Sequence, residues 1–487
     1  MSESIQQTSD RTASGDELIR GSLGAWEIAF FTIAAAGPLL VVAGFAPLAF
    51  MIGGVGAVGA QLIAGVVLLL FAVGLTRMAV RIRNSGAFYA YIGRGLGKPV
   101  GGGAAVLALV AYSVIATGQL GAVGAFAVGP MKEITGLDVP WPVWSFGALF
   151  IVAFLGHRKV SLSAKVLGVA LLSEASILLV LAVAVLVRGG PEGIDLSGFE
   201  PNSIFAGAGS GAMFAIVFGA FIGFESTAIY SEEARDPART LPRAVYLAVG
   251  FLAIFYTFMA WVIVVAYGKS EIASAATKDP VGLVFAAMEK YVGHPAVVVT
   301  EILLVSSAFA SVLAFHNTAT RYIFALGRER LLPKRLAQVH PVHGSPYVAS
   351  RVQAIFAFCV IFIFMLIGAD PYLEVFLLMV APGVLAVVVL QALCSVAIVV
   401  FFNHHEKQHG LTHWSTTVAP AFSFLALSVA SWLIATNFEY FSNRTGAMNW
   451  ILLSVLPISF AAGVARTLYM RKNQPEQYEQ LTQTQVY

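Results

Sequence analysis

Four acidic residues lie inside long apolar runs of this chain, where carboxylates are rare: Glu174, Glu225, Glu301 and Glu374. A charged side chain at the centre of a membrane helix costs about 2.5–3.5 kcal/mol on insertion scales, so each acid needs a partner or a task. Two of them, Glu174 and Glu225, lie away from the ends of their runs. We predict that Glu174 or Glu225 binds and releases a proton, or faces a positively charged group. The alternative is a protonated acid that only satisfies broken backbone.

The composition places the acids in a membrane. Of 487 residues, 58% are hydrophobic and 11% are charged, and the mean hydropathy is +0.81. Soluble domains have roughly 45–50% apolar and about 25% charged residues. Successive apolar runs of about 20 residues each fit the thickness of a bilayer. The sequence therefore predicts an all-α polytopic membrane protein whose main surroundings are the lipid bilayer, with no nucleic-acid partner and no cofactor.

Twelve transmembrane helices are predicted, and no connection between them is long enough for a soluble domain. Their approximate bounds are 26–51, 56–76, 101–128, 141–156, 165–187, 204–230, 242–267, 294–326, 347–368, 373–402, 416–436 and 448–468.

The Lys and Arg residues predict the orientation. Only six of the 29 fall in the loops that are outside if the N-terminus is inside: Lys132, Arg188, Lys269, Lys278, Lys290 and Arg444. By the positive-inside rule both termini are cytoplasmic, in a multi-pass protein of the cell (plasma or inner) membrane. Residues 1–25 are polar and lack the pattern of a signal peptide, so we expect a disordered cytoplasmic tail there. Residues 471–487 form the other tail.

Two of the predicted spans contain helix breakers at membrane depth. The first has Gly37-Pro38 near its middle, and the sixth has Gly219 and Gly223 just before Glu225. Broken backbone in a bilayer must line a cavity or be covered by protein. The two breaks are five spans apart, as inverted repeats of five helices require. This pattern is typical of secondary transporters with a midplane site, although single glycines and prolines are also common in membrane helices.

Three segments carry a resemblance to a known family. GFESTAIYSEEARDPARTLPRA (223–244) is similar to the sixth-span signature of the amino acid–polyamine–organocation (APC) transporters. NSGAFYAYIGRGLGKPVG (84–101) resembles their segment before the third span. TRYIFALGRERLLPKRLAQVHPVHGSPYVAS (320–350) resembles their loop between spans eight and nine. Together with the twelve spans, the resemblance covers nearly the whole chain.

The resemblance implies a fold and a cargo. The fold is the LeuT type, with a first inverted repeat at 26–187, a second at 204–402 and two further helices within 412–470. The cargo is an amino acid or a related amine, including polyamines, carried by alternating access. Proton symport is the favoured mechanism, because two acids are buried and no sodium site is evident. Exchange of one amino acid or amine for another is the alternative.

The family's binding residues map onto the two breaks. Backbone N–H groups at Ala35, Ala36 and Gly37 would hold the substrate carboxylate. Carbonyl groups of the sixth helix would hold its amino group, with Phe218 or Phe221 as an aromatic lid; these residues are Phe218, Gly219, Ala220, Phe221 and Ile222. From the residues themselves we add Glu225, which could face the amine, and Tyr112, Thr117 and Gln119 as polar groups of the third span. The last three could instead pair with neighbouring backbone.

The chain departs from the family pattern in two places. Most members have a G-(S/T/A)-G stretch in the first helix, whereas this chain has AAAGP at 34–38. An amine without a carboxylate therefore also fits. Some members have a lysine in the fifth helix in place of a sodium ion, and alignment from Ser163-Ala164-Lys165 brings it onto Glu174. The charge at that position is reversed here.

An enzyme of another class is a remote alternative. HEKQH at 405–409 matches H-E-x-x-H, in which two histidines one turn apart bind zinc and the glutamate acts as base. The match lies in a short loop that ends at Gly410, which is poorly suited to exclude water. We expect no metal site there. A channel is also disfavoured, because the chain shows no filter sequence and no ring of charges.

Overall fold

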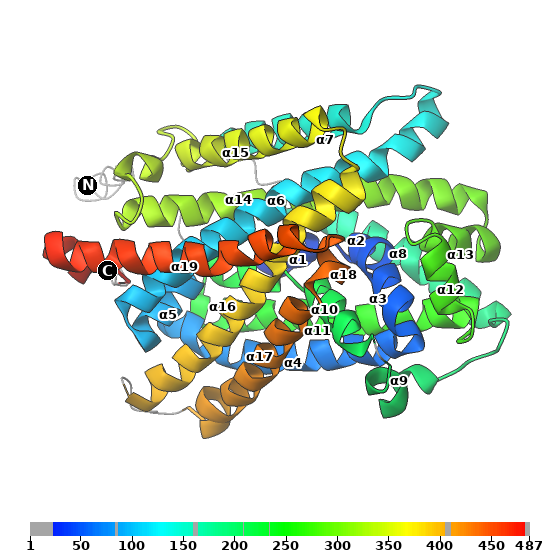
Figure 1. Cartoon of the computed structure of the whole chain (residues 1–487), viewed down its shortest axis with the longest axis horizontal. Helices are drawn as coiled ribbons and strands as arrows, with labels where there is room; N and C mark the ends of the chain where they lie inside the picture. The colour runs from blue at the N-terminus through cyan, green and yellow to red at the C-terminus, as the bar shows by residue number, and fades with distance from the viewer. Residues whose placement is uncertain are drawn as a thin grey trace, which may run out of the picture.

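The computed structural model describes residues 23–82, 86–158, 164–207, 209–232, 234–404 and 411–482. These residues form helices and short connections, and no strand occurs among them apart from a single parallel bridge between Leu23 and Ala234. Long helices run side by side along the longest axis of the molecule (Figure 1). We call the end of each helix that is predicted to face the cytoplasm its inner end, and the opposite end its outer end.

The first five predicted spans correspond to helices with similar bounds. The first is split into several pieces, and the others are continuous. They are α1 (Ala25–Ala36), α2 (Pro38–Leu40), the π-helix η2 (Val41–Phe45) and α3 (Ala46–Gly53), then α4 (Ala57–Arg81), α6 (Lys98–Thr135), α7 (Trp141–Arg158) and α8 (Ala164–Arg188).

The next five spans follow the same order, and the sixth is again split. They are α10 (Ser210–Ala220) with the 3₁₀ helix η5 (Phe224–Glu232), α11 (Pro237–Tyr267), α14 (His294–Arg328), α15 (Tyr347–Leu366), and η7 (Pro371–Phe376) continuing into α16 (Leu377–His404). The last two spans are η8 (Trp414–Val418) with α17 (Ala419–Thr436), and α19 (Ala447–Asn473).

Eleven helices in the described part of the chain are long and apolar enough to cross a membrane. The one predicted span that is not among them is the fourth, α7, whose apolar part is shorter. It packs between α6 and α15. The all-helical membrane architecture is thus present, while the count of twelve spans and the five-plus-five repeat stay predictions.

The two broken helices lie at the centre of the bundle. In the most apolar stretch of the first span 89% of the residues are buried inside the protein, and in that of the sixth span all residues are buried. The corresponding share is only 22% for α19 and 33% for α15. Large apolar side chains at the periphery of the bundle, for example Phe150 of α7 and Trp450 of α19, are each 74% exposed, as expected for surfaces that face lipid. The bundle therefore surrounds the interrupted helices with protein.

Short helices that the sequence did not predict close the two ends of the bundle. At the inner end, α5 (Phe88–Leu96) packs against α6 and α16. At the outer end, α12 (Ile272–Lys278) packs against α3, and α13 (Leu283–Tyr291) packs against α14. The remaining short elements are η3 (Gly54–Gly56), η4 (Ser197–Phe199), α9 (Pro201–Phe205), η6 (Lys334–Ala337), α18 (Phe438–Ser442) and α20 (Pro475–Gln480).

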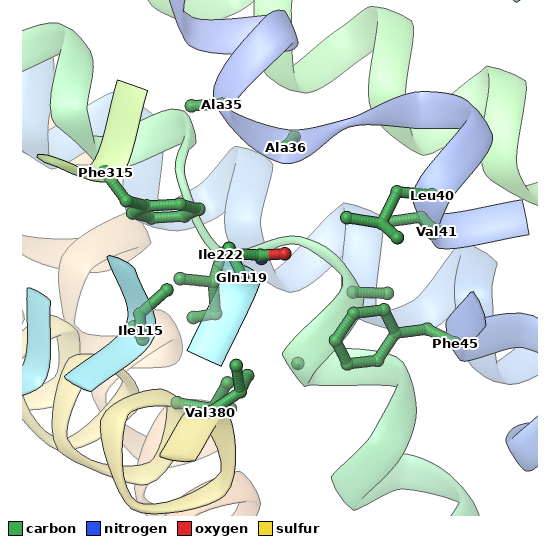
Figure 2. Close-up of a pocket in the computed structure, with 13 residues that line it drawn as sticks. Ala35, Ala36, Leu40, Val41, Phe45, Ile115, Gln119, Ile222, Phe315 and Val380 are labelled. Atoms are coloured by element: carbon green, nitrogen blue, oxygen red, sulfur yellow. The ribbon is translucent and has the colours of Figure 1, made fainter. Parts of the chain in front are cut away.

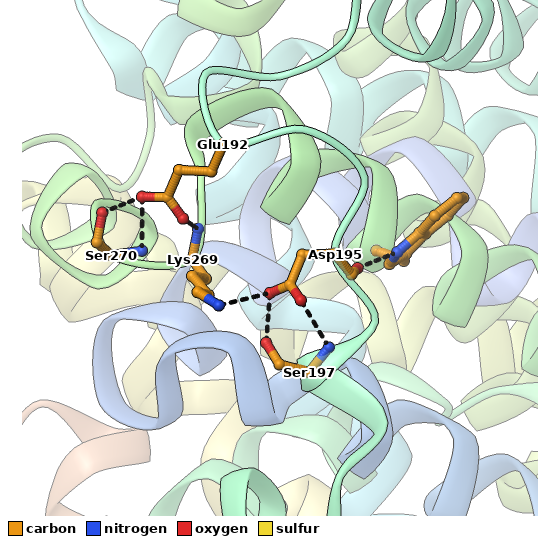
Figure 3. Close-up of polar contacts among 6 residues, drawn as sticks. Glu192, Asp195, Ser197, Lys269 and Ser270 are labelled. Carbon is orange, nitrogen blue, oxygen red and sulfur yellow. Dashed lines mark hydrogen bonds and ion pairs between the residues drawn. The ribbon is translucent and has the colours of Figure 1, made fainter.

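Two acids of the α8–α9 loop hold the α11–α12 connection at the outer end (Figure 3). The carboxylate of Glu192 accepts hydrogen bonds from the hydroxyl of Ser270 and from the backbone N–H of Lys269, the latter at 2.9 Å. Asp195 accepts from the backbone N–H and the hydroxyl of Ser197, and it lies 3.9 Å from Lys269 Nζ. These contacts fasten two outer loops that are far apart in the sequence.

Candidate functional site

The first membrane helix is interrupted at Gly37. Its backbone has φ 58° and ψ 74°, in the left-handed region that residues with a Cβ atom rarely enter. The N–H of Gly37 donates to the carbonyl oxygens of Ile33 and Ala34, which ends α1. Pro38 then begins α2, a position that suits proline because no hydrogen-bond donor is needed there. The sequence-predicted interruption is present at the expected residues.

The sixth membrane helix is interrupted after Ala220. There α10 ends, Gly223 has φ 122°, and the chain continues from Phe224 as a 3₁₀ helix. A Cβ atom on Gly223 would lie 3.2 Å from the backbone nitrogen of Ala36 and 3.3 Å from the carbonyl carbon of Ala35. The two breaks therefore touch each other backbone to backbone, and a glycine is required at the crossing.

A small pocket lies at this crossing, with a cavity volume of about 20 Å³. Figure 2 shows the unwound ribbon of the first helix passing above the pocket and that of the sixth helix running along it. The walls are completed by side chains from α6, α14 and α16. Five membrane helices thus contribute to one site.

The predicted backbone residues divide into two groups. Five of them line the pocket: Ala35, Ala36, Gly219, Ala220 and Ile222. Three others, Gly37, Phe218 and Phe221, are not among the lining residues, and the ring of Phe221 packs edge-on against Tyr256 with the ring centroids 5.3 Å apart. The structure therefore places neither predicted lid residue at the pocket.

The aromatic rings that do line the pocket are Phe45 and Phe315 (Figure 2). Phe45 comes from the π-helical part of the first membrane helix, and Phe315 from α14. Sequence reasoning missed both, because each lies in a run of apolar residues that offers no signal of direction. With Leu40, Val41 and Ile115 they make the side-chain lining strongly apolar.

Gln119 supplies the only polar side chain among the lining residues. Its Oε1 atom is buried and makes no hydrogen bond to another described residue. Thr117 instead donates to the backbone carbonyl of Ser113 at 2.8 Å. This is the pairing with neighbouring backbone that the sequence left open as the alternative to substrate binding. Tyr112 does not line the pocket. Gln119 is therefore the polar group of this helix that a bound molecule would meet.

Glu174 lies at the start of the second half of the first membrane helix. It is 3% exposed, and its Oε2 atom accepts a 2.8 Å hydrogen bond from the hydroxyl of Ser307 on α14. The same oxygen faces the backbone N–H of Leu39 at 3.4 Å. Leu39 is the second residue of α2, so the carboxylate occupies the end of that helix where the backbone dipoles favour negative charge.

Glu225 has a corresponding place at the start of η5. It is 1% exposed, and its Oε2 atom accepts from the backbone N–H of Gly223 at 3.0 Å. Its Oε1 atom accepts from the hydroxyl of Tyr112 at 2.8 Å, and the amide of Gln391 lies 3.5 Å from Oε2. A buried glutamate thus lies at the start of the second half of each interrupted helix, Glu225 from the same helix and Glu174 from α8, and neither glutamate lines the pocket.

The other two acids of the apolar runs differ from these. Glu374 lies in the first turn of η7, where it accepts from the backbone N–H of Asp370 at 2.8 Å and pairs with Arg444. Glu301 is partly exposed on α14. Both lie toward the outer ends of their helices.

Gln391 and Ser307 were not predicted as parts of the site. Each is a single polar residue in an apolar span, which is a usable signal, but many such residues only bond to their own helix. Thr257 of α11, for instance, donates to the backbone carbonyl of Ala253 one turn earlier. The partner on another helix decides the role, and the sequence does not reveal it.

The candidate zinc segment at 405–409 lies outside the described residues. Among the residues that are described, no group of three His, Cys, Asp or Glu side chains is placed to hold a metal ion.

Comparison with known proteins assigns the family. A family model described as amino acid permease matches residues 23–460, nearly the whole chain. The branched-chain amino acid permease BcaP of Bacillus subtilis is 25% identical over 361 residues, which cover 69% of this chain and 73% of that protein. The methylthioribose transporter of the same organism is 25% identical over 300 residues, covering 59% and 62%.

An uncharacterized transporter of Mycobacterium tuberculosis, Rv1999c, is 34% identical over 137 residues. That match spans 28% of this chain and only 30% of the relative's length. The extended family match and the bundle of apolar helices agree with each other. The chain therefore belongs to the amino acid permease family, within the APC superfamily.

Proposed function

We propose that the protein imports an amino acid with an apolar side chain together with a proton, by alternating access around the two breaks. The observation that carries this proposal is the pocket at the crossing of the two interrupted helices, with backbone on one side and apolar side chains on the other. Broken helices around a midplane site are typical of secondary transporters. The orientation, with both termini cytoplasmic in the cell membrane, follows the distribution of Lys and Arg.

The helix ends at the pocket suit the two charged groups of an amino acid. Leu40, in the first turn of α2, lines the pocket, as do Gly219 and Ala220 in the last turn of α10. The start of a helix favours negative charge and its end favours positive charge. The substrate carboxylate is therefore expected to point toward α2, and the ammonium group toward the carbonyl groups at the end of α10.

The lining selects the side chain. Phe45, Ile115, Val380 and Val384 offer no partner to a charged group. Removing an unpaired polar group from water costs roughly 2–7 kcal/mol, and a charge costs more, so a basic or acidic side chain is disfavoured. That BcaP of Bacillus subtilis is named a branched-chain amino acid permease supports the same substrate class.

Glu174 provides a physical link between proton and substrate. When ionised, its carboxylate lies at the same helix start that the substrate carboxylate would approach, and two like charges at one such site repel. Protonation removes that charge. Binding of a proton to Glu174 and of an amino acid to the pocket would then favour each other, and this coupling is reciprocal. Glu225 is the second proposed proton site.

Uptake by the purified protein in liposomes tests the proposal. Labelled leucine, phenylalanine, lysine, glutamate and a polyamine would each be offered with a pH gradient, with a sodium gradient, or with internal substrate alone. Accumulation of leucine or phenylalanine that follows the pH gradient is expected. Uptake only in exchange for internal substrate would make the protein an exchanger.

Two further results would overturn parts of the proposal. Preferential uptake of lysine, glutamate or the polyamine would contradict the substrate class, and a polyamine cargo would agree with the AAAGP departure at 34–38. Accumulation that follows sodium and ignores pH would contradict proton coupling while leaving the site intact.

A further inference from the structure

A set of buried tyrosines extends from Glu225 toward the inner end of the bundle. Tyr112 donates to Glu225 and stacks on Tyr322 of α14, with ring centroids 5.2 Å apart and planes 21° from parallel. Tyr322 also lies close to Glu225 and to Tyr91 of α5. Tyr91 in turn lies near Cys394 of α16. We call Tyr112, Tyr322, Tyr91 and Gln391 the inner polar column.

Two polar atoms of the inner polar column, the hydroxyl oxygen of Tyr91 and the Oε1 atom of Gln391, have no hydrogen-bond partner among the described residues. The hydroxyl of Tyr322 meets the backbone of Phe88 but forms no well-aligned hydrogen bond, and all three side chains are at most 1% exposed. A buried polar atom without a partner costs about 1–3 kcal/mol. Buried water, which typically makes about three hydrogen bonds, is the usual way to satisfy such atoms. Gln391 and Tyr322 lie beside Glu225, and Tyr91 lies next to Tyr322, so these atoms together indicate a hydrated site.

The column leads toward the inner surface. Its last member, Tyr91, belongs to α5, which lies with the final turns of α19 at one end of the molecule (Figure 1). The neighbouring Tyr89 hydrogen-bonds through its hydroxyl to Glu329, which follows the inner end of α14. In contrast, Gln119 and the pocket lie on the other side of Glu225 along α6, toward the outer end.

We propose that the inner polar column is a hydrated proton pathway through which Glu225 exchanges its proton with the cytoplasm. This inference rests on the proposed proton coupling and adds its inner route. The protonated carboxyl of Glu225 gives its proton to a water molecule, which passes one on to the next water or tyrosine hydroxyl. Each hydroxyl accepts one proton and releases another. The net result is a carboxylate at Glu225 and one proton in the cytoplasm.

Few other titratable groups face Glu225. Tyr112 comes from α6 and Tyr322 from α14, while α16 contributes the neutral amide of Gln391. From α1, Thr32 meets Thr227 of η5 at 3.0 Å, and from α4 the ring of Phe71 packs on Phe224. The tyrosine hydroxyls are therefore the groups best placed to relay a proton.

Removing single hydroxyl groups tests the pathway. Tyr322→Phe and Tyr91→Phe keep the aromatic rings, so packing is preserved. In liposomes that contain a pH-sensitive dye, substrate-driven proton entry and net uptake are expected to slow by about tenfold or more, in the range of a lost proton-transfer group. Exchange of labelled for unlabelled substrate at equal pH moves no net proton and should change by less than about twofold.

Tyr372→Phe is the matched control, since its hydroxyl donates to Gly44 in the outer half, away from the column. A second readout is the rate of hydrogen–deuterium exchange at the Glu225 carboxyl, followed by infrared spectroscopy and assigned with Glu225→Gln. This rate should fall in Tyr322→Phe and remain unchanged in Tyr372→Phe.

The outcomes separate the two proposals. Unchanged proton entry in Tyr322→Phe, Tyr91→Phe and their double variant would overturn the pathway, as would a parallel loss of exchange and net uptake. If the unaltered protein moves substrate without protons, the proposed coupling fails instead. In that case the infrared rates still decide whether the inner polar column connects Glu225 to solvent.

Discussion

Ser307 donates its hydroxyl to the same oxygen of Glu174 that faces the first turn of α2, so the carboxyl group connects α14 with the second half of the first membrane helix. In both contacts the acid accepts, from the hydroxyl of Ser307 and from the backbone N–H of Leu39. Such donors favour the ionised form of Glu174, whereas the burial of its side chain disfavours that form. A bound substrate carboxylate would disfavour the ionised form further, and this repulsion is the proposed origin of coupling between proton and substrate.

Replacing Glu174 by glutamine should remove most of the pH dependence of substrate affinity. The amide is neutral at every pH, so substrate affinity should become nearly constant between pH 5.5 and 8.5. In the unaltered protein, affinity should fall toward high pH by up to about tenfold per pH unit, the limit for one linked proton. Isothermal titration calorimetry with leucine at several pH values measures this.

Glu374→Gln is the control for that experiment, because this acid pairs with Arg444 near the outer end and lies outside the pocket. An affinity that keeps its full pH dependence in Glu174→Gln would assign the linked proton to another group, with Glu225 as the next candidate.

Changing the size of Ile115 should shift the choice of substrate. Its side chain lines the pocket, so Ile115→Ala enlarges the site and Ile115→Phe fills it. One methylene in an apolar pocket is worth about 1–3 kcal/mol in selectivity. Relative uptake of phenylalanine over valine should therefore rise by about tenfold or more in the alanine variant and fall in the phenylalanine variant.

Competition between labelled valine and unlabelled phenylalanine measures this shift. Ile254→Ala provides the same change on a side chain that is 74% exposed on α11, and it should leave selectivity as it was. Equal selectivity in all variants would show that the substrate binds elsewhere.

A single methyl group on Gly223 should abolish transport. Alanine at φ 122° is strained, at a cost of about 1–3 kcal/mol, and its Cβ atom would press on the backbone of Ala35 and Ala36. We expect uptake by Gly223→Ala to fall by at least about tenfold, because the crossing of the breaks cannot keep its geometry.

Gly250→Ala is the companion variant, since a Cβ atom there meets no other atom within 4 Å. Its uptake should match the unaltered protein. Size-exclusion chromatography of both variants in detergent distinguishes a folded, inactive carrier from an unfolded one. Normal uptake by Gly223→Ala would show that the crossing tolerates displacement.

The hydrogen bonds of Glu192 to Lys269 and Ser270 at the outer end should make the stability of the fold depend on pH. The hydroxyl of Ser270 above all, with the backbone N–H groups of Ser270 and Lys269, lowers the pKa of Glu192 below its usual value. A lowered pKa in the folded state contributes stability above the pKa of the unfolded chain, and this is lost as pH falls through the folded value. The melting temperature of Glu192→Gln should therefore lie below that of the unaltered protein at pH 7.

The two melting temperatures should converge as the pH falls through the lowered folded-state pKa of Glu192, below which the acid is protonated in both states. Differential scanning fluorimetry across this range gives the comparison. Glu271→Gln changes an exposed acid in the same connection and should leave the melting temperature unaffected. A constant difference at all pH values would mean that glutamine harms the loop through its shape alone.

The interruptions could be predicted from the sequence because their causes are local. Gly37-Pro38 and Gly223 impose backbone conformations that a regular helix does not allow, whatever surrounds them. Burial of Glu174 and Glu225 could also be expected, because a carboxylate that faces lipid in the middle of a span is costly. Their hydrogen-bond partners, Ser307 and Gln391, are set by packing between distant helices and were not predictable.

The pocket lining could not be predicted for another reason. Phe315 and Ile254 are similar in sequence terms, since both are large apolar residues of long apolar helices, yet one lines the pocket and the other is exposed at the lipid-facing surface. In soluble proteins polar residues mark the outer face of a helix, whereas in a bilayer both faces are apolar. The direction of such a side chain follows only from the assembled bundle.

The bridge at the inner end of the first helix has a consequence for movement. The backbone N–H of Arg235 donates to the carbonyl of Leu23 at 2.8 Å, and Thr32 meets Thr227 further along the same two segments. The inner halves of the first and sixth helices are thus connected at two positions along their length, and we expect them to move together as one rigid unit. Opening toward the cytoplasm would then be a single all-or-none step, with both halves leaving the scaffold together.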